Sequence, residues 1–260
     1  MLRTPVKPDF ETVPVEFHSL LQSAPVFDSS CSPMARVYFI DQDGGYYLKS
    51  SPRGTLEMES RMTSFFHGLS LGPEVLGYVS AERDWLLTRA VKGEDCTHAM
   101  YLDDPKRLSE TLALTLRQLH SMDVSRCPVN RLEAYIGDAN QNYREGKYDT
   151  SLFPDNWGYT SAEEAWSMIR ENGHLLKADT LIHGDYCLPN VMLDNWRFSG
   201  FIDLGRAGAG DRHMDIFWGA WTLQFNLKTD AYCRRFLDAY GKEAFDEEKL
   251  RLVAAFEVFL

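Results

Sequence analysis

Polar and apolar positions alternate over short stretches in the first third of the chain, a pattern typical of β-strands. The runs at 35–40 and 46–50 flank the connection DQDGG, and together they predict a β-hairpin. A second hairpin is predicted for the runs EVLGYVS and DWLLTR, with its turn at 82–84. Between the hairpins, apolar residues at helical spacing predict a helix that Gly72 and Pro73 end. These apolar residues are Met58, Met62, Phe65, Phe66 and Leu69.

Helical periodicity dominates the rest of the chain. Pro105 begins a predicted helix behind Asp104, and Ser161 with Glu164 forms a capping box for another that ends near Gly173. The buried stripe of the first consists of Leu108, Leu112, Leu116 and Leu119. Further helices are predicted at about 211–227, 230–240 and 246–259, with Asp211, Asp230 and Asp246 as N-caps. One pair of strands is predicted in this part, 191–193 with 200–203.

These elements predict an α+β fold with two lobes and a cleft between them. Residues 1–88 would form a β-rich N-terminal lobe, residues 89–95 a connector, and residues 96–260 a helical C-terminal lobe. With 44% hydrophobic and 13% aromatic residues, the chain has enough apolar side chains to fill such cores.

The charge of the chain narrows the classes of ligand. Lys and Arg number 27 while Asp and Glu number 38, so the formal net charge is −11. This balance argues against a nucleic-acid partner and suits a cationic small molecule, although acidic composition is also common because it favours solubility.

Localisation is predicted from cysteines and apolar runs. The N-terminal segment lacks the apolar stretch of a signal peptide, and no run reaches the length of a membrane span. The cysteines follow no metal-site or disulfide spacing, which indicates free thiols in a reducing compartment. They are Cys31, Cys96, Cys127, Cys187 and Cys233. A cytoplasmic protein without a membrane partner is therefore expected.

The stretch LIHGDYCLPNVMLDNWRFSGFIDLGR, residues 181–206, places charged and amide groups within an apolar hairpin. If the strand register is symmetric about 196 and 197, Asn190 lies opposite Asp203. Two oxygen ligands at adjacent strand ends suit Mg²⁺, because waters and phosphate oxygens can complete its octahedron. Asp185, on the loop that enters the hairpin, is then a candidate acceptor for a hydroxyl proton. His183 is expected to brace this loop through hydrogen bonds.

The order His183, Asp185, Asn190 and Asp203 follows the logic of a protein-kinase catalytic loop. Together with LHSMDVSRCPV, SGFIDLGRAGAGDRHMDI and the closing FEVFL, it makes nearly the whole chain resemble the aminoglycoside phosphotransferases, and among them the 3′-phosphotransferases. The resemblance implies a protein-kinase-like fold, ATP or GTP with Mg²⁺, and phosphorylation of a sugar hydroxyl. It also implies a monomer or weak dimer that binds a nucleotide and a cationic aminoglycoside.

The resemblance also implies roles for residues of the nucleotide site. Asp185 would be the catalytic carboxylate, Asn190 and Asp203 the magnesium ligands, and Lys49 the lysine that holds the α- and β-phosphates. Lys49 ends the strand 46–50, where its ammonium group would project into the cleft.

A carboxylate on the helix at 55–69 should pair with Lys49, and Glu59 is preferred to Glu57. The nucleotide loop would be SSCSP, residues 29–33, which has no glycine, so the hydroxyls of Ser30 and Ser32 and the backbone would serve the phosphates. Adenine would bond to main-chain groups near Arg89 and Val91, with Leu87 or Thr88 lining the pocket.

Carboxylates should line the acceptor site, because aminoglycosides carry several ammonium groups. Asp155 and Glu257 are the candidates, with Glu163 and Glu164 in support. Glu257 either joins an internal network or meets a cation. Arg206 is expected to brace its loop or lie near a phosphate.

Other readings of the sequence stay open. One alternative is a kinase of another small alcohol, such as choline, a macrolide or another sugar. A second is a non-catalytic, nucleotide-binding pseudokinase, which the intact set of Lys49, Asp185, Asn190 and Asp203 disfavours. A two-metal phosphoesterase would need a second His/Asp cluster, which the sequence lacks.

Overall fold

The computed structural model describes residues 3–31, 34–151 and 158–260. Ser32 and Asp155, both predicted site residues, lie outside the described residues. By its contacts the chain divides into two compact units. The first comprises Met1–Cys96 and Pro189–Arg206, and the second Thr97–Leu188 and Ala207–Leu260.

A six-stranded antiparallel sheet in the order β1-β2-β3-β4-β6-β5 forms most of the first unit. Its strands are β1 (Thr4–Pro5), β2 (Val26–Asp28), β3 (Arg36–Ile40), β4 (Tyr46–Pro52), β5 (Val75–Ser80) and β6 (Arg83–Arg89). The two predicted hairpins, β3–β4 and β5–β6, are confirmed. Strands β1 and β2 were not predicted, because two or three residues are too few to show a period.

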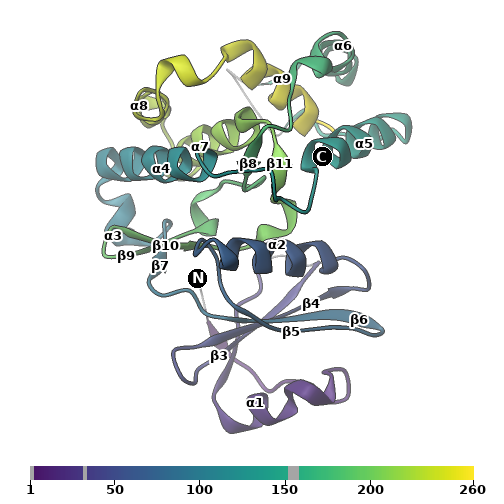
Figure 1. Cartoon of the computed structure of the whole chain (residues 1–260), viewed down its shortest axis with the longest axis vertical. Coiled ribbons are helices and arrows are strands. Elements are labelled where there is room, and N and C mark those ends of the chain that lie inside the picture. The colour runs from purple at the N-terminus through teal and green to yellow at the C-terminus, as the bar shows by residue number, and fades with distance from the viewer. Residues whose placement is uncertain (1–2, 32–33, 152–157) are drawn as a thin grey trace. The chain divides into compact units, whose positions relative to one another are not determined.

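Two helices of the first unit lie on opposite sides of this sheet, α1 (His18–Ser23) and α2 (Glu57–Gly68) (Figure 1). Phe17 and Leu21 pack with Leu48, Trp85 and Leu87 in the core on one face. Helix α2 is the helix predicted between the hairpins. It buries Met62 and Phe66, while Met58 at its start stays exposed.

The hairpin of β9 (Val191–Asp194) and β10 (Arg197–Phe201) also belongs to the first unit. Strand β7 (Glu94–Asp95) pairs with β9, and the backbone N–H of Phe201 donates to Leu71 O at 2.7 Å. The sequence partition had placed 189–206 in the C-terminal lobe. Nonlocal pairing groups it with the N-terminal strands instead.

The predicted register of this hairpin is wrong by two residues at the turn and by one residue from Gly200 onwards. Asn195 and Trp196, both at positive φ, form the two-residue turn, so Arg197 pairs with Asp194. An irregularity between Phe198 and Gly200 then shifts the register, and Ile202 N donates to Asn190 O at 3.0 Å. Asn190 therefore faces Ile202 rather than Asp203.

The second unit is mainly helical. Its helices are α3 (Ala99–Leu102), α4 (Pro105–His120), α5 (Arg131–Arg144), α6 (Ala162–Asn172), α7 (Arg212–Leu227), α8 (Ala231–Tyr240) and α9 (Glu247–Glu257). Within the unit, α4 packs against α7 and α8, and α9 against α6 and α7. No helix in the described part of the chain is long and apolar enough to cross a membrane.

Most of the predicted helix starts are confirmed. Side chains of Asp104, Ser161, Asp211 and Asp246 each accept a hydrogen bond from the first turn of their helix. Asp230 precedes α8 as predicted, but its side chain makes no capping hydrogen bond. Helix α5, capped by the side chain of Asn130, was not predicted.

The second unit contains a strand pair that was not predicted, so the prediction of a single pair after residue 95 is wrong. Strand β8 (Thr180–Ile182) pairs with β11 (Gly208–Gly210). The glycine-rich β11 has no side-chain pattern from which a strand could be read. A Cβ atom at Gly210 would collide with the side chain of Ile182 on β8, so glycine leaves room for that side chain. Single turns of 3-10 helix occur at Val15–Phe17, Gly173–Leu175, Leu188–Asn190, Leu204–Arg206 and Lys242–Ala244.

Candidate nucleotide site and catalytic loop

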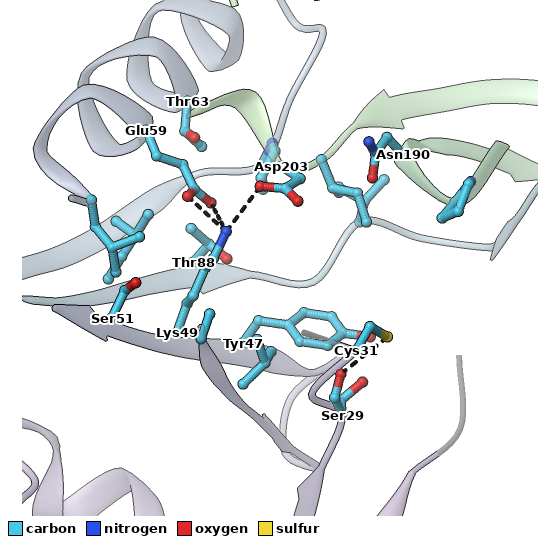
Figure 2. A pocket seen from close by; sticks show the side chains of 18 of the residues that line it. Ser29, Cys31, Tyr47, Lys49, Ser51, Glu59, Thr63, Thr88, Asn190 and Asp203 are labelled. Carbon is cyan, nitrogen blue, oxygen red and sulfur yellow. Dashed lines mark hydrogen bonds and ion pairs between the residues drawn. The ribbon is translucent and has the colours of Figure 1, made fainter. Parts of the chain in front are cut away.

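A cavity of about 460 Å³ lies within the first unit. Strands β3, β4 and β6, helix α2 and the β9–β10 hairpin all contribute to its walls, and Figure 2 shows its side chains. Its charged and hydrogen-bonding side chains include Ser29, Tyr47, Lys49, Ser51, Glu59, Thr63, Thr88, Asn190 and Asp203. Apolar walls with a few convergent polar groups are typical of small-molecule sites.

Lys49 lies at the centre of an ion-pair cluster in this cavity (Figure 2). Its Nζ is 2.9 and 2.7 Å from the carboxylate oxygens of Glu59 and 2.9 Å from Asp203 Oδ1. Burial alone would lower the pKa of Lys49, but the two carboxylates outweigh it and leave the pKa above its usual value. Lys49 is therefore cationic at neutral pH and joins β4, α2 and the β9–β10 hairpin.

Glu59, rather than Glu57, makes this contact. Glu59 lies in the first turn of α2 and is 8% exposed, whereas Glu57 points to solvent. Burial raises the pKa of Glu59, and the carboxylate of Asp203 adds to the effect, although Lys49 opposes it. The structure thus brings together the lysine and the glutamate that the sequence prediction paired.

Asn190 and Asp203 line the same cavity, although the strands do not place them opposite each other. Asp203 follows β10 with φ of +58°, a left-handed conformation that is uncommon for a non-glycine residue. This local backbone turn, rather than strand pairing, directs the Asp203 carboxylate to Lys49. No cluster of three or more His, Cys, Asp or Glu side chains suited to a metal exists among the described residues. One amide and one carboxylate are a donor set that needs further oxygen ligands from water or phosphate.

The loop at 29–33 is only partly as predicted. Ser29 and Cys31 line the cavity. The Oγ of Ser30 instead accepts a hydrogen bond from Val37 N at 2.9 Å, and Ser30 N donates to Asp28 Oδ1. Ser30 therefore shapes the loop rather than facing the cavity.

Thr88, Arg89 and Val91 line the cavity at the end of β6, as expected for the segment that would meet the base. Leu87 belongs to the core on the other face of the sheet, which decides between the two predicted lining residues. The Arg89 guanidinium pairs with Glu74 at 3.2 Å.

Tyr47 is a lining residue that the sequence reasoning missed (Figure 2). It lies two residues before Lys49 on β4, and residues two apart on a strand face the same side. This spacing was the available signal.

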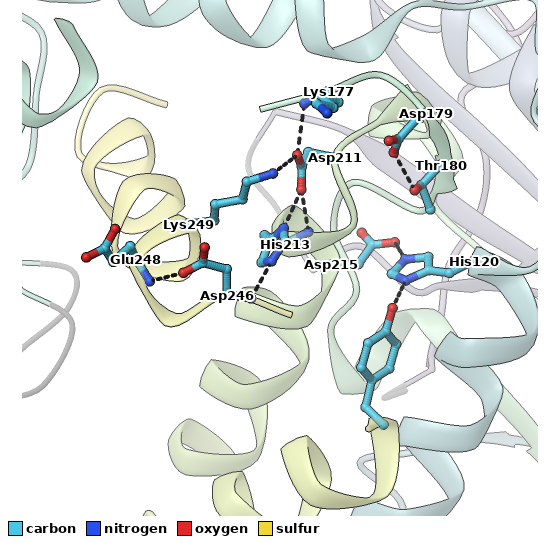
Figure 3. Close-up of polar contacts among 11 residues, drawn as sticks. His120, Lys177, Asp179, Thr180, Asp211, His213, Asp215, Asp246, Glu248 and Lys249 are labelled. Atoms are coloured by element: carbon cyan, nitrogen blue, oxygen red, sulfur yellow. Dashed lines mark hydrogen bonds and ion pairs between the residues drawn. The ribbon is translucent and has the colours of Figure 1, made fainter. Parts of the chain in front are cut away.

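In the second unit, Asp215 holds the loop that carries Asp185. The carboxylate of Asp215 is fully buried and accepts hydrogen bonds from His183 N and Gly184 N, both at 2.7 Å. Its Oδ2 is also 3.1 Å from His120 Nε2, and Figure 3 shows these two side chains facing each other. Asp185 N donates to His183 Nδ1 at 3.3 Å, which confirms that His183 braces the loop. The sequence feature that could have indicated Asp215 is the position of a carboxylate within the apolar run of α7.

Replacing Asp215 with Asn should weaken both the fold and the reaction. The amide NH₂ would face a backbone N–H that now donates to a carboxylate oxygen, so the free energy of unfolding should fall by about 2 kcal/mol. A looser Asp185 should lower kcat by about tenfold or more. Urea denaturation and steady-state kinetics measure these effects. Asp138→Asn, on the exposed face of α5, is the matched control, and equal stability of the two variants would contradict the prediction.

A second buried polar cluster ties the start of α7 to the start of α9 (Figure 3). Asp211 accepts hydrogen bonds from Lys177 N at 2.8 Å and from His213 N at 3.0 Å, and its Oδ1 is 2.5 Å from His213 Nδ1. His213 Nε2 accepts from Asp246 N, so the proton of a neutral imidazole is on Nδ1. Burial by itself would raise the pKa of Asp211, but the hydrogen bonds from His213 outweigh it and lower the pKa to about 2.

This lowered pKa predicts acid sensitivity of the second unit. Because the folded pKa lies below that of an unfolded Asp, about 3.9, Asp211 stabilises the fold above pH 4 and loses this effect as pH falls from about 4 to 2. The shift corresponds to about 3 kcal/mol near neutral pH. Urea midpoints of the wild type and of Asp211→Asn should differ at pH 6 and converge below pH 4, while exposed Asp123→Asn should change them less. A pH-independent difference would contradict the prediction.

Glu257 is buried in an internal network, and its role as a ligand of the acceptor stays a prediction. It is 3% exposed and accepts hydrogen bonds from Tyr135 Oη at 3.0 Å and Trp218 Nε1 at 3.1 Å. The internal network is therefore the arrangement that the structure has. Glu164 serves the capping of α6 through Thr160 and Ser161, and Arg206 is exposed.

Comparison with known proteins identifies relatives over almost the entire length. Residues 34–253 match the family model described as phosphotransferase enzyme family. A probable aminoglycoside 3′-phosphotransferase of Lactococcus lactis subsp. lactis (strain IL1403) is 45% identical over 253 residues, covering 96% of each chain.

Solved structures agree with this result. The crystal structure of a type VIII aminoglycoside-3′-phosphotransferase matches with a TM-score of 0.72 and 26% identity, covering 90% of this chain and 91% of that one. An aminoglycoside phosphotransferase of Streptomyces rimosus in complex with ADP and streptomycin matches with a TM-score of 0.71 and 25% identity, covering 94% and 97%. The predicted α+β fold of the protein-kinase-like class is confirmed. The chain thus belongs to the phosphotransferase enzyme family and, as its sequence motifs predicted, is similar to the aminoglycoside 3′-phosphotransferases.

Proposed function

We propose that this protein transfers the γ-phosphate of ATP or GTP to the 3′-hydroxyl of an aminoglycoside and so confers resistance to the antibiotic. The observation that carries the proposal is the cluster of Lys49 with Glu59 and Asp203 in a cavity that Asn190 also lines. A fixed lysine beside oxygen donors suits a triphosphate. The relative of 45% identity is named for this activity, and the ADP and streptomycin complex of the Streptomyces rimosus protein fits the same chemistry.

In this proposal, different residues of the cavity bind the phosphates and the base of the nucleotide. Lys49 binds the α- and β-phosphates and Glu59 holds its side chain in place. The base lies against Tyr47 and bonds to main-chain groups near Arg89 and Val91. Ser29 and Cys31, which line the cavity, replace Ser30 on the phosphate side.

Mg²⁺ fits the donors that the cavity offers, because Asn190 and Asp203 supply hard oxygen ligands and leave room for phosphate oxygens. When bound, the ion would neutralise charge on the phosphates. Lys49 would hold the Asp203 carboxylate in place for this role.

Asp185 is the proposed catalytic carboxylate. It would orient the attacking hydroxyl of the acceptor and receive its proton late in the transfer, since phosphoryl transfer depends mainly on positioning and charge stabilisation. Asp215 and His183 keep its loop in one conformation. We place the nucleotide in the cavity of the first unit and the acceptor against the helical second unit, in a cytoplasmic monomer or weak dimer.

Nucleotide consumption tests the function directly. With Mg²⁺ and ATP or GTP, the purified protein should turn over in the presence of kanamycin and not with tobramycin, which lacks the 3′-hydroxyl. Turnover with both antibiotics would show that the phosphate is transferred to another hydroxyl. Absence of turnover with any aminoglycoside would contradict the proposal and favour a kinase of choline, a macrolide or another sugar.

A further inference from the structure

A row of aromatic side chains connects the N-terminal strand with the cavity. In the sheet, Pro5 pairs with Phe27, Phe27 with Phe39, Phe39 with Tyr47, and Tyr47 with Thr88. Directly paired residues of neighbouring strands share one face of a sheet. The ring centroids of Phe27 and Phe39 are 6.3 Å apart and those of Phe39 and Tyr47 are 5.2 Å apart. We call Phe27, Phe39 and Tyr47 the aromatic row.

Arg3 contacts two members of the aromatic row. Its Cζ lies 3.4 Å from the ring centroid of Phe39, and its Nη2 donates to Tyr47 Oη at 3.0 Å. A planar guanidinium can stack on one ring and donate a hydrogen bond from its edge at the same time. The pairing of Thr4 with Asp28 fixes the point at which Arg3 leaves the sheet.

Gly45 provides the space that this arrangement needs. It has φ of +97°, and a Cβ atom there would lie 2.6 Å from Phe39 Cε2. Phe39 itself is 6% exposed, so Arg3 stacks on a ring that packing already holds. Because Arg3 stacks on the fixed ring of Phe39, its hydrogen bond holds the hydroxyl of Tyr47 in a defined position.

We propose that Arg3 is a positioning residue for the donor nucleotide, which it serves by holding the side chain of Tyr47 in place. The proposal rests on the proposed function, since it requires a nucleotide base in the cavity. Tyr47 is the single aromatic side chain among the described residues that line the cavity. A ring that is already oriented loses less conformational entropy when a base stacks on it, so binding is tighter. The N-terminal segment is by this route part of the nucleotide site.

Substitutions at both ends of the contact test the proposal in the full chain. Arg3→Ala should weaken nucleotide binding and raise the nucleotide KM by about two- to fivefold, the range expected of an exposed cation–π contact and hydrogen bond. The kcat and the KM for the acceptor should stay unchanged. Tyr47→Phe keeps the ring and removes the hydroxyl that Arg3 contacts. The double variant should bind nucleotide no more weakly than whichever single variant binds it less tightly, because both substitutions remove the same contact.

Two partial ligands separate stacking from charge. Adenosine, which has the base and no phosphate, should inhibit Arg3→Ala less strongly than the wild type. Tripolyphosphate, which has phosphates and no base, should inhibit both equally. Arg36→Ala is the matched control. Arg36 forms an exposed ion pair with Asp28 in the same sheet, and by strand alternation it lies on the face opposite to Val37 and Phe39. It should leave nucleotide binding unchanged.

The results distinguish this proposal from the function on which it rests. If the wild type bound no nucleotide, the proposed function would fail, and the role of Arg3 with it. If the wild type bound nucleotide and Arg3→Ala bound it equally well, only the role of Arg3 would fail. Additive losses in the double variant, or weaker inhibition by tripolyphosphate, would also overturn it, because each points to an effect that does not act through Tyr47.

Discussion

Asp185→Asn should abolish most of the turnover while nucleotide still binds. The substitution keeps the size of the side chain and removes the carboxylate that would orient the hydroxyl and take its proton. General-base catalysis contributes about 10²- to 10⁴-fold, so kcat should fall by that factor. The backbone of the loop should stay in place, because His183 and Gly184 bond to Asp215 through main-chain groups. Steady-state kinetics with an aminoglycoside and nucleotide titration measure the two effects separately.

Asp194→Asn is a suitable control for this variant. Asp194 ends β9 within the same sequence motif, and its carboxylate pairs with Lys92 at 2.7 Å rather than lining the cavity. Its substitution should leave kcat unchanged. Near-normal turnover of purified Asp185→Asn would refute the assignment of the catalytic carboxylate.

Lys49→Ala should weaken both nucleotide binding and transfer. Three carboxylate oxygens lie within 2.7 to 2.9 Å of Nζ, so removal of the ammonium group leaves Glu59 and Asp203 without their shared counter-ion. We expect kcat/KM for the nucleotide to fall by about 10²- to 10³-fold, a range typical of a lost charge contact at a phosphate site. The free energy of unfolding should also fall, by about 2 kcal/mol, because Glu59 would be a buried and unpaired charge.

A second substitution separates these two effects. Glu59→Gln in the Lys49→Ala background removes the unpaired charge, so the free energy of unfolding should recover towards the wild-type value. Activity should remain low, since the cation is still missing. Recovery of activity in the double variant would show that Lys49 acts only through stability and not on the nucleotide.

Much of the candidate site was predictable because its residues are close in the chain or marked by local patterns. At the helix starts, the side chains of Asp104, Ser161 and Asp211 cap backbone N–H groups two or three residues later, so local sequence determines them. The ordered set of Asp185, Asn190 and Asp203 is likewise readable, because it follows the order of a kinase catalytic loop, in which one carboxylate meets the hydroxyl and two oxygen ligands hold the metal.

Residues that act through distant partners were missed or misjudged. Asp215 serves a loop more than thirty positions earlier, and its spacing to His183 follows from packing of α7 alone. Glu257 was compatible with either an internal network or a cation, and only the structure shows its hydrogen bonds with Tyr135 and Trp218. Arg3, next to β1, contacts Tyr47 on β4, and β2 and β3 lie between these strands in the sheet, so no local pattern connects the two residues.

The sequence by itself determined the two N-terminal hairpins, most helices, the family and the pairing of Lys49 with Glu59, because short-range periodicity and motif order encode them. Only the tertiary structure decided that the 189–206 hairpin joins the N-terminal unit, that Asn190 faces Ile202, and that Asp203 turns towards Lys49 through a positive φ. A one-residue turn shift and one irregular strand position have no signature in residue type, and pairing between strands far apart in the chain is settled by packing.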